Sequence, residues 1–579
     1  MPNGCIDNLL CLHFFRKHRS GIREGILNLY PCDVKSCDVL VIGGGGSGAL
    51  AALEASTDDT LNVALISRGP VGQSGLTPTA NGGALIAGPG IDPALLFEEM
   101  VYAGRFLNDQ DVIWFLNHEA GLCLEKLKSY GMPVIRFAPK SVCVPAIDAL
   151  KRARKILKSR PNVTLLEDML VTSLSNTDGR VCGATVLDLR TGQFFAISAK
   201  ATVLATGGMS GELYPYSSNN PFGISTDAAG AGHALACQAG AELVDMEMVQ
   251  FVPLPSGNRF LNIRFFPEFW VGPYMNARGE IVEGNVMEYP GNFYSYQLAQ
   301  KLYREIEKGN GPIYIDRREQ PPPNQGPPIQ CWADRRNLIR RLDIDPQQHK
   351  IEVVIGSHFN AGGVSINARA ETTIPGLFAA GEVTGNINGA LRLAGISFTQ
   401  MIVFGIESGK QAARFALENQ KPSGLSKEEV KREQDRLAAF FKPENRVRLV
   451  DLRRQLQQTM EQHFFIVRTR PGMIAGMEKI EAILEQIPRI AVPACKRFNL
   501  EWARAIEFEL LVQVAKITAA SALAREESRG FHKRTDFPDE NNGRWLVHTV
   551  AKQDEAKLRI RTRPVTITRL SPGDPYGAR

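Results

Sequence analysis

A glycine-rich segment, Gly43 to Gly48, stands between an apolar, β-branched run at 38–43 and a run of small, helix-forming residues at 49–55. A second apolar run follows at 62–67. This order of strand, helix and strand favours a parallel sheet covered by helices. In the pattern Gly43-x-Gly45-x-x-Gly48, the glycines permit a tight turn, close approach of a pyrophosphate and close helix packing. The N-terminus of the helix favours the phosphate charge, so the chain is predicted to bind a nucleotide here.

The end of the second predicted strand limits the choice of nucleotide. NAD-binding folds usually carry Asp or Glu at this position, whereas this chain has Ser67 and Arg68, a hydroxyl and a cation. An arginine suits the additional phosphate of NADP, so the loop alone leaves NADP and FAD open. A second block, Gly356 to Ser397, follows more than 300 residues later and carries a histidine and an arginine among its glycines. One pocket built from two such distant pieces of chain favours FAD.

The composition is that of a folded globular chain. Of the 579 residues, 44% are hydrophobic and 22% are charged. The net charge of +6 is small for this length, so it suits an anionic substrate or an acidic partner and does not indicate nucleic acid. The ten cysteines form no CxxC pair and no dense cluster. We therefore expect neither a zinc site nor an iron–sulfur centre within this chain.

The N-terminal stretch has its apolar residues before its basic ones, which is the reverse of a secretory signal. No run of about 18 uninterrupted apolar residues appears, so no membrane span is expected. Scattered cysteines in a long chain are typical of a reducing compartment. We therefore expect a cytoplasmic protein in which residues 1–36 are a variable leader.

Several motifs, taken in order, resemble those of the flavoprotein subunits of succinate dehydrogenase and fumarate reductase. L-aspartate oxidase and the alpha chain of adenylylsulfate reductase belong to the same superfamily. The motifs, which run from about Asp38 to Leu546, are DVLVIGGGGSG, GGALIAG, VLATGG, AGAELVDMEMVQF, SHFNAGGV, IPGLFAAGEV, GALRLAG and REESRGFHKRTDFP. The resemblance implies an FAD-dependent oxidoreductase of the α/β class. It also implies a Rossmann-like FAD-binding domain, an inserted α+β capping domain and a C-terminal helical domain.

The expected domain boundaries combine this resemblance with changes in composition along the chain. Residues 251–350 are rich in aromatic residues and proline, residues 425–525 show helical spacing, and the tail is basic and contains prolines, which is typical of an extended arm. The expected parts are a leader at 1–36, an FAD-binding domain at 37–250 and 353–420, a capping domain at 251–352, a helical domain at 421–546 and a C-terminal arm at 547–579.

The resemblance also assigns contacts with FAD. Glu382 is similar to the acid that binds FAD, and Ser397 lies where the isoalloxazine is contacted. The predicted FAD-binding residues are Gly43, Gly45, Gly46, Gly48, Ser67, Arg68, Ser74, Thr77, Gly82, Gly83, Ala205, Thr206, Gly207, Glu382 and Ser397. Two positions depart from the family. Leu76 stands where the respiratory enzymes carry the histidine that bonds covalently to FAD, so noncovalent FAD is expected, and Ala231 replaces an aspartate.

The same resemblance implies that His358 and Arg392 hold the substrate. A guanidinium suits bidentate capture of a carboxylate or sulfate. The alternative interpretation is structural, with His358 bonded to a backbone carbonyl and Arg392 in a local ion pair. On the capping side, Val252 stands where the family has a histidine, and the family's catalytic arginine falls near Ser295. Arg259 and Arg264 are the nearby candidates to replace the missing cation, with Arg264 taken as the catalytic residue; the alternative for each is a solvated or ion-paired arginine.

Three functions follow as alternatives. The first is hydride transfer between flavin and a small anionic substrate, with electrons relayed to an iron–sulfur partner protein. The second is the same chemistry on an amino dicarboxylate or a sulfur oxyanion, and the QFVP segment is closer to adenylylsulfate reductase than to a dicarboxylate enzyme. The third is a flavoprotein that only transfers electrons. The loss of capping-side residues supports the third alternative, whereas the presence of Arg392 and His358 opposes it.

Overall fold

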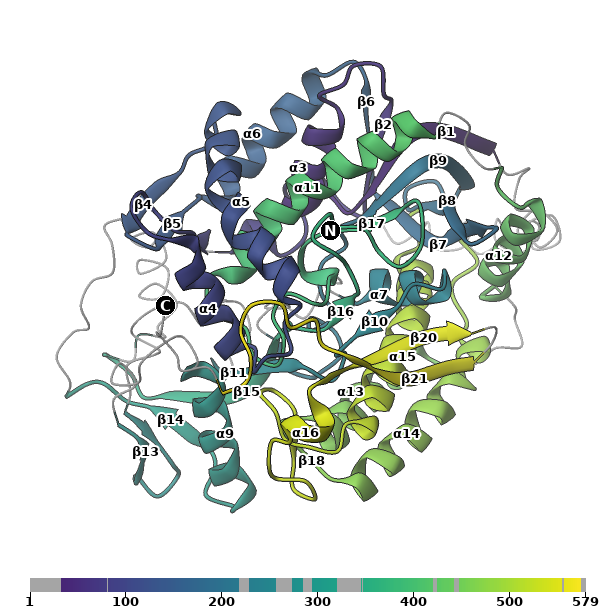
Figure 1. Ribbon diagram of the computed structural model, residues 1–579. Helices are drawn as coiled ribbons and strands as arrows, with labels where there is room; N and C mark the ends of the chain where they lie inside the picture. The colour runs from purple at the N-terminus through teal and green to yellow at the C-terminus, as the bar shows by residue number, and fades with distance from the viewer. Residues whose placement is uncertain are drawn as a thin grey trace, which may run out of the picture.

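The computed structural model describes residues 33–80, 82–217, 229–256, 273–284, 294–319, 345, 347–419, 424–441, 447–554 and 557–573. Three regions are distinct in Figure 1. A sheet covered by helices lies at the top, a smaller sheet with one helix lies at the lower left, and the C-terminal helices lie at the lower right. The chain is therefore a mixed α/β protein, which confirms the predicted fold class.

The main sheet has seven strands, built from the N-terminal part of the chain and one later strand. They are β1 (Asp33–Ile42), β2 (Val63–Ser67), β6 (Val163–Glu167), β7 (Met169–Thr177), β8 (Arg180–Asp188), β9 (Phe194–Leu204) and β17 (Leu377–Ala379). The order is β6-β2-β1-β9-β8-β7, and β17 pairs with the end of β9. β6, β2, β1, β9 and β17 are parallel, whereas β7 and β8 are antiparallel additions. β2 is buried along its whole length, as expected for a parallel strand covered on both faces.

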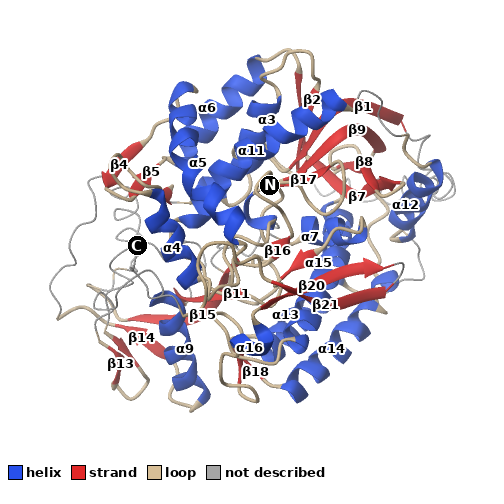
Figure 2. Cartoon of the chain, in the orientation of Figure 1, coloured by secondary structure: helices blue, strands red, loops and turns tan. Residues whose placement is uncertain are grey.

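Two helices that are far apart in the sequence cover one face of this sheet (Figure 2). They are α3 (Gly46–Ala55) and α11 (Ile396–Glu418). Their close approach depends on glycine, because a Cβ atom at Gly405 or Gly409 of α11 would collide with the backbone of α3. Small residues at such a contact let two helices lie close together. The two distant glycine-rich blocks of the sequence are therefore in direct contact.

Further elements extend this side of the molecule. They are α4 (Pro93–Ala103), α5 (Gln110–Ser129), α6 (Ala146–Ser159) and a small sheet of β3 (Gly83–Leu85), β5 (Ser141–Cys143) and β4 (Ile135–Ala138). The chain between 93 and 130 thus forms two helices. The break occurs because Asp109 accepts hydrogen bonds from the backbone N–H groups of Asp111 and Val112 and so caps α5.

The segment predicted as the capping domain forms a five-stranded sheet with α9 (Tyr294–Glu307). Its strands are β11 (Val249–Pro255), β12 (Tyr274–Met275), β13 (Ile281–Glu283), β14 (Ile313–Ile315) and β15 (Ile351–Asn360). The strand order is β11-β15-β14-β12-β13. The expected boundaries at 250/251 and 352/353 fall inside β11 and β15, which pair with each other. These two strands therefore run continuously from one region into the other.

The region that follows is mainly helical, as the spacing at 425–525 predicts. Its helices are α12 (Lys427–Ala439), α13 (Leu449–Phe464), α14 (Arg470–Leu484), α15 (Leu500–Ala524) and the short α16 (Asn542–Trp545). Two short strands, β18 (Val467–Arg468) and β19 (Lys533–Arg534), pair in parallel between them. α15 is buried over most of its length and packs against α14 and against α7 (Ala231–Gln238).

The C-terminal tail corrects the expectation of an extended arm. β20 (Val547–Asp554) and β21 (Lys557–Pro564) form an antiparallel hairpin, and β20 also pairs with β10 (Leu243–Val244). Val550 and Ala551 are fully buried, and Leu558 and Ile560 pack against the core while basic residues alternate with them. Alternation of buried and exposed residues is typical of half-buried strands. The expectation of an arm was based on the basic and proline residues and did not consider this alternation.

A buried ionic network joins the helical region, the hairpin and the segment before β11. Arg525 contacts Asp245 at 3.2 Å, Glu247 at 2.6 Å and Glu527 at 2.9 Å. These four side chains are at most 3% exposed. Glu527 also pairs with Arg529 at 2.7 Å. Burial lowers the pKa of Arg525, but the three carboxylates more than offset this, so the pKa is raised. The charges in this network are therefore compensated within the protein.

Candidate functional site

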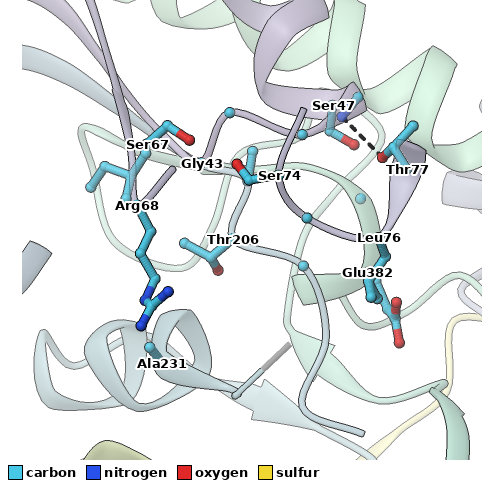
Figure 3. Close-up of a pocket in the computed structure, with 18 of the residues that line it drawn as sticks. Gly43, Ser47, Ser67, Arg68, Ser74, Leu76, Thr77, Thr206, Ala231 and Glu382 are labelled. Atoms are coloured by element: carbon cyan, nitrogen blue, oxygen red, sulfur yellow. Dashed lines mark hydrogen bonds between the residues drawn. The ribbon is translucent and has the colours of Figure 1, made fainter. Parts of the chain in front are cut away.

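A cavity of about 270 Å³ lies at the C-terminal ends of β1, β2 and β9. Both glycine-rich blocks line this cavity, together with residues from the start of α7 and from α15. The carboxyl ends of parallel strands are the usual ligand-binding edge of such a sheet. Figure 3 shows part of the lining, with Arg68 on one side and Glu382 on the other.

The loop between β1 and α3 has the geometry that its glycines predict. Gly43 has φ of 116°, and a Cβ atom there would collide with the carbonyl oxygen of Ala205. A Cβ atom at Gly48 would collide with the carbonyl oxygen of Gly43, so this glycine permits close packing of α3 on the loop. At Gly45 the nearest atom to such a Cβ is 3.7 Å away, so the backbone there faces open space. That open backbone can accept a pyrophosphate.

The N-terminus of α3 is open to a ligand. Its capping residue, Gly45, has no side chain to accept from the first backbone N–H groups, and only Gly46 N–H donates to a side chain, Thr77 Oγ1, at 3.1 Å. The hydroxyl of Thr206 also lines the cavity, and its buried Oγ1 atom has no hydrogen-bond partner in the described part of the chain. Buried polar atoms of this kind normally have partners, so both features indicate a missing polar ligand.

Glu382 is held at the other side of the cavity by β15. Its Oε1 atom accepts from the backbone N–H of Asn360 at 3.3 Å, and its carbonyl accepts from the Asn360 side chain at 3.1 Å. Asn360 is fully buried and is itself fixed by the backbone N–H of Met209, which donates to Asn360 Oδ1 at 3.0 Å. The carboxylate is therefore positioned before any ligand binds.

Arg68, predicted from the strand end to contact the nucleotide, lines the cavity but has a protein partner. Its Nε and one terminal nitrogen pair with the two carboxylate oxygens of Glu507 in α15, and the second of these contacts is 3.1 Å. The two residues are 439 positions apart in the sequence. This bidentate pair brings a carboxylate to the end of β2.

Arg392 and His358 lie beside each other, with His358 in the cavity lining and Arg392 outside it. The distance between Arg392 Nη2 and His358 Nε2 is 3.1 Å. Two nitrogens of the guanidinium donate to Gln250 Oε1 at 3.3 and 3.1 Å, and the third donates to Ser397 Oγ at 3.3 Å. The guanidinium also lies over the ring of Phe359, 4.6 Å from its centroid. His358, Phe359 and Ser397, which all contact Arg392, line the cavity.

The charge of Arg392 is not balanced by a direct ion pair. Its side chain is buried, and no carboxylate of the described residues lies within ion-pair distance of it. Burial lowers the pKa of Arg392 to about 10, and the more distant carboxylate of Glu382 acts against this shift. The structural alternative, a local ion pair at Arg392, is not what the described residues show. A buried cation with neutral partners attracts an anion.

Most of the predicted site residues line the cavity. Those that do are Gly43, Gly45, Gly46, Ser67, Arg68, Ser74, Thr77, Ala205, Thr206, Gly207, His358, Glu382 and Ser397. Gly48, Gly82, Gly83 and Arg392 lie outside the lining. Gly82 has φ of 73°, and a Cβ atom there would collide with the carbonyl oxygen of Val144, so its requirement for glycine comes from the backbone. Arg264 lies outside the described residues.

Several residues that contribute to the cavity or to Arg392 were not identified from the sequence, and three of them carry side chains that matter here. Glu507 and Met401 line the cavity, and Gln250 holds Arg392. Gln250 stands two residues before Val252 in the QFVP segment, and this position in a recognised motif could have identified it as a site residue. Glu507 stands in an ordinary helical pattern and carries no local signal. Val252 is fully buried in β11 and pairs with Gly356.

Comparison with known proteins identifies the family. Residues 38–261 and 274–398, more than half of the chain, match a family model described as FAD binding domain. Residues 453–575 match a model described as Fumarate reductase flavoprotein C-term. The chain belongs to the fumarate reductase/succinate dehydrogenase flavoprotein family. FAD is thus its cofactor, and the chain is an FAD-dependent oxidoreductase.

The similarity between this flavoprotein and its relatives covers nearly its whole length. A fumarate reductase flavoprotein subunit of Mycobacterium tuberculosis is 31% identical, over 93% of this chain and 98% of the relative. A CoM/CoB fumarate reductase chain of Methanothermobacter marburgensis is 30% identical, over 88% and 95%. The FrdA chain of an E. coli quinol fumarate reductase has a TM-score of 0.81 at 25% identity, covering 93% of this chain and 98% of that one. An adenylylsulfate reductase from Archaeoglobus fulgidus shares the fold, with a TM-score of 0.76 at 20% identity over 94% and 99%.

The residues of the cavity fit FAD. The glycine loop leaves backbone open to a pyrophosphate, the α3 N-terminus is uncapped, the Thr206 hydroxyl lacks a partner and Glu382 presents a carboxylate. These features need a ligand that is long, polar and anionic near α3. Among the described residues, no helix is long and apolar enough to cross a membrane, and no group of three or more His, Cys, Asp and Glu side chains could hold a metal ion.

Proposed function

We propose that this flavoprotein exchanges a hydride with a small anionic substrate bound beside Arg392 and His358. The observation that carries the proposal is the buried guanidinium of Arg392, whose hydrogen-bond partners among the described residues are all neutral. FAD supplies the two-electron centre to or from which the hydride moves. Arg392 would bind an oxyanion group of the substrate with two parallel hydrogen bonds, as guanidinium groups do with carboxylates and sulfates.

His358 would share this role at the cavity wall. It lines the cavity, and its Nε2 atom contacts the guanidinium of Arg392, which can only donate. The nitrogen near Arg392 is therefore an acceptor, which favours the neutral tautomer with the proton on Nδ1. In this tautomer the histidine can donate a hydrogen bond to a substrate oxygen and help to orient it.

The substrate class is a small carboxylate or another small oxyanion, and the capping side would select among them. Val252 places an apolar side chain where the family has a histidine, and it is fully buried. Adenylylsulfate reductase shares the fold, and its name makes a sulfur oxyanion a useful member of any test panel. Arg264 is proposed as the capping-side cation because the chain offers no histidine at 252.

Electrons are proposed to pass between this chain and an iron–sulfur partner protein. Several relatives are named as flavoprotein subunits, which indicates that they act within larger enzymes. The described part of this chain provides no cluster of ligands for a metal. Purification of the native complex followed by iron and acid-labile sulfide analysis tests this relay. A flavoprotein that reduces its substrate at full rate without an iron–sulfur protein contradicts it.

FAD is proposed to be bound without a covalent link. Leu76 lines the cavity beside Thr77, and an aliphatic side chain has no nucleophilic atom for such a bond. Precipitation of the holoprotein with acid should release all the yellow colour to the supernatant. A coloured pellet, or a flavin-bearing peptide after proteolysis, contradicts this.

Titration of the flavin absorbance against a panel of anions tests the substrate site. Fumarate, succinate, aspartate, sulfite and adenylylsulfate should be compared in the wild type and in Arg392→Met. At least one anion should perturb the wild-type spectrum at sub-millimolar concentration, and the variant should lose that response. Arg448→Met is a suitable control, because Arg448 is exposed and pairs only locally with Asp451. If Arg392→Met binds the same anion as tightly as the wild type, the proposed site is wrong.

A further inference from the structure

The FAD cavity contains a carboxylate that the sequence does not place there. Dinucleotide-binding folds usually carry an acid at the end of the second strand, where it accepts hydrogen bonds from ribose hydroxyls. This chain has Ser67 and Arg68 at that point. In the folded chain, Glu507 of α15 reaches the same point and lines the cavity. We propose that Glu507 binds the ribose hydroxyls of the adenosine half of FAD, and that Arg68 positions it.

The location follows from the register of the sheet. β1 and β2 are parallel with Ile42 opposite Ile66, and the N–H of Gly43 donates to the carbonyl of Ile66 at 2.8 Å. A Cβ atom at Gly44 would collide with the side chain of Ser67, so the glycine loop and the end of β2 touch. The pyrophosphate loop and the ribose-binding position of this fold are thus neighbours, and the Arg68–Glu507 pair begins at the residue after Ser67.

The chemistry of the pair suits a ribose. A carboxylate has about four acceptor sites, so Glu507 can keep its two contacts with Arg68 and still accept from hydroxyl groups. The Glu507 side chain is only 6% exposed, and the bidentate arginine keeps its negative charge compensated there. Arg68 extends toward Ala231 at the start of α7 (Figure 3), and Ala231 offers only a methyl group. Glu507 is the carboxylate that the described lining provides at this end of the cavity, since Glu382 lies on the opposite side.

The competing explanation is structural. Arg68 and Glu507 join the main sheet to α15, so the pair could serve only to hold the helical region in place. The two explanations differ in what they require of FAD. A tether has no preference for one ribose over another, whereas a ribose-binding carboxylate requires the hydroxyl groups.

The experiment measures the dissociation constant of the reconstituted apoprotein for FAD and for FAD analogues that lack the 2′- or the 3′-hydroxyl of the adenosine ribose, by quenching of flavin fluorescence. Wild type should bind FAD roughly 10- to 100-fold more tightly than at least one analogue, the effect expected for a hydrogen bond to a charged group. Glu507→Gln should weaken binding of FAD and should distinguish FAD from that analogue much less than the wild type does, because a neutral amide oxygen is a weaker acceptor than a carboxylate. Glu509→Gln is the control, because Glu509 lies in the same helix, pairs with Arg436 of α12 and is not part of the cavity lining.

The outcomes separate the two explanations. If Glu507→Gln binds FAD more weakly but keeps the wild-type preference for the ribose hydroxyls, the pair is only a tether and the proposal is wrong. If Glu507→Gln does not fold, the wild type alone decides: equal affinity for FAD and both analogues overturns the proposal. Glu509→Gln should keep the full preference even if its thermal midpoint falls, and loss of preference in this control would also overturn the proposal.

Discussion

Two buried arginines in this flavoprotein have opposite surroundings. Arg525 is enclosed by three carboxylates, and its pKa is raised because they outweigh the cost of burial. Arg392 is also buried but bonds to an amide oxygen, a hydroxyl, a histidine and a backbone carbonyl. Burial lowers its pKa to about 10. The first guanidinium is neutralised by the fold, whereas the second retains a positive charge that an external anion can balance.

The difference indicates how the chain separates stability from function. A buried ion pair or network is strongly destabilised when one partner is removed, because the remaining charges lose their compensation. An uncompensated buried charge lowers the stability of the free protein, so its removal should not destabilise the fold. Such a charge becomes favourable only when an anionic ligand binds beside it. Substitutions at the two arginines and a change of pH should separate these properties, with the largest effect at Arg525.

Removal of Arg525 should give the largest loss of stability. Arg525→Met keeps most of the side-chain volume but leaves Asp245, Glu247 and Glu527 buried without their common partner. The free energy of unfolding should fall by about 3–5 kcal/mol, which urea denaturation of the holoprotein can measure. The exposed control, Arg448→Met, should leave the midpoint nearly unchanged. A midpoint for Arg525→Met that matches this control contradicts the role given to the network.

Removal of Arg392 should act on activity. Arg392→Met should lower kcat/KM for the best anionic substrate by about 10²- to 10³-fold, as for loss of one preorganised charged donor. The urea midpoint should stay near that of the wild type, because the variant also removes a desolvated charge. Steady-state kinetics and denaturation of the same preparation provide both values. A large loss of stability with little change in kcat/KM would reverse the assignment of the two arginines.

Supplying a carboxylate should make Arg392 resemble Arg525. Gln250→Glu places that carboxylate where Gln250 Oε1 now accepts from two guanidinium nitrogens. The dissociation constant for an anion should rise by about tenfold or more, because the protein then provides the counter-charge. Gln250→Leu, which removes the acceptor without adding charge, should weaken anion binding less. Unchanged anion affinity in Gln250→Glu would contradict the proposal that Arg392 binds the anion as its missing counter-charge.

Of these two arginines, only Arg392 should lose its charge at alkaline pH. Its pKa of about 10 means that the guanidinium loses its proton above that pH in the anion-free protein, so anion affinity should fall about tenfold for each pH unit above 10. Below pH 10 the affinity should be independent of this group. Arg525 has a raised pKa and should keep its charge throughout. Stopped-flow titration after a rapid pH jump measures this before alkaline unfolding. Constant affinity between about pH 9 and 11 contradicts the low pKa.

The sequence predicted the parts of the site that local chemistry controls. The glycine loop needs glycine because of Gly43's positive φ and the close packing at Gly48, and both constraints act within a few residues. The fold class followed in the same way, because buried parallel strands such as β2 have continuous apolar sequences. Such signals can be recognised without knowledge of the tertiary structure.

The parts that the sequence did not predict depend on contacts between distant segments. Glu507 enters the cavity only because the fold brings this part of α15 to Arg68, and the sequence around Arg68 did not indicate that a carboxylate would pair with it. The hairpin at 547–564 was missed for another reason, since its basic residues suggested an arm although they alternate with apolar ones. The state of Arg392 also required the fold, because an arginine's partners cannot be counted from its neighbours in sequence.

β15 connects the small sheet directly to the residues around the cavity. This strand starts in the small sheet with Ile351, paired to β14, and ends at Asn360, which fixes Glu382; His358 lies two residues before that end. A rigid strand transmits displacement along its length. Any rotation of the small sheet that keeps its pairing with β15 must therefore shift His358 or bend the strand near Gly356. Such a rotation would therefore also change the proposed substrate site, so a substrate that fixed the small sheet would fix the position of His358 as well.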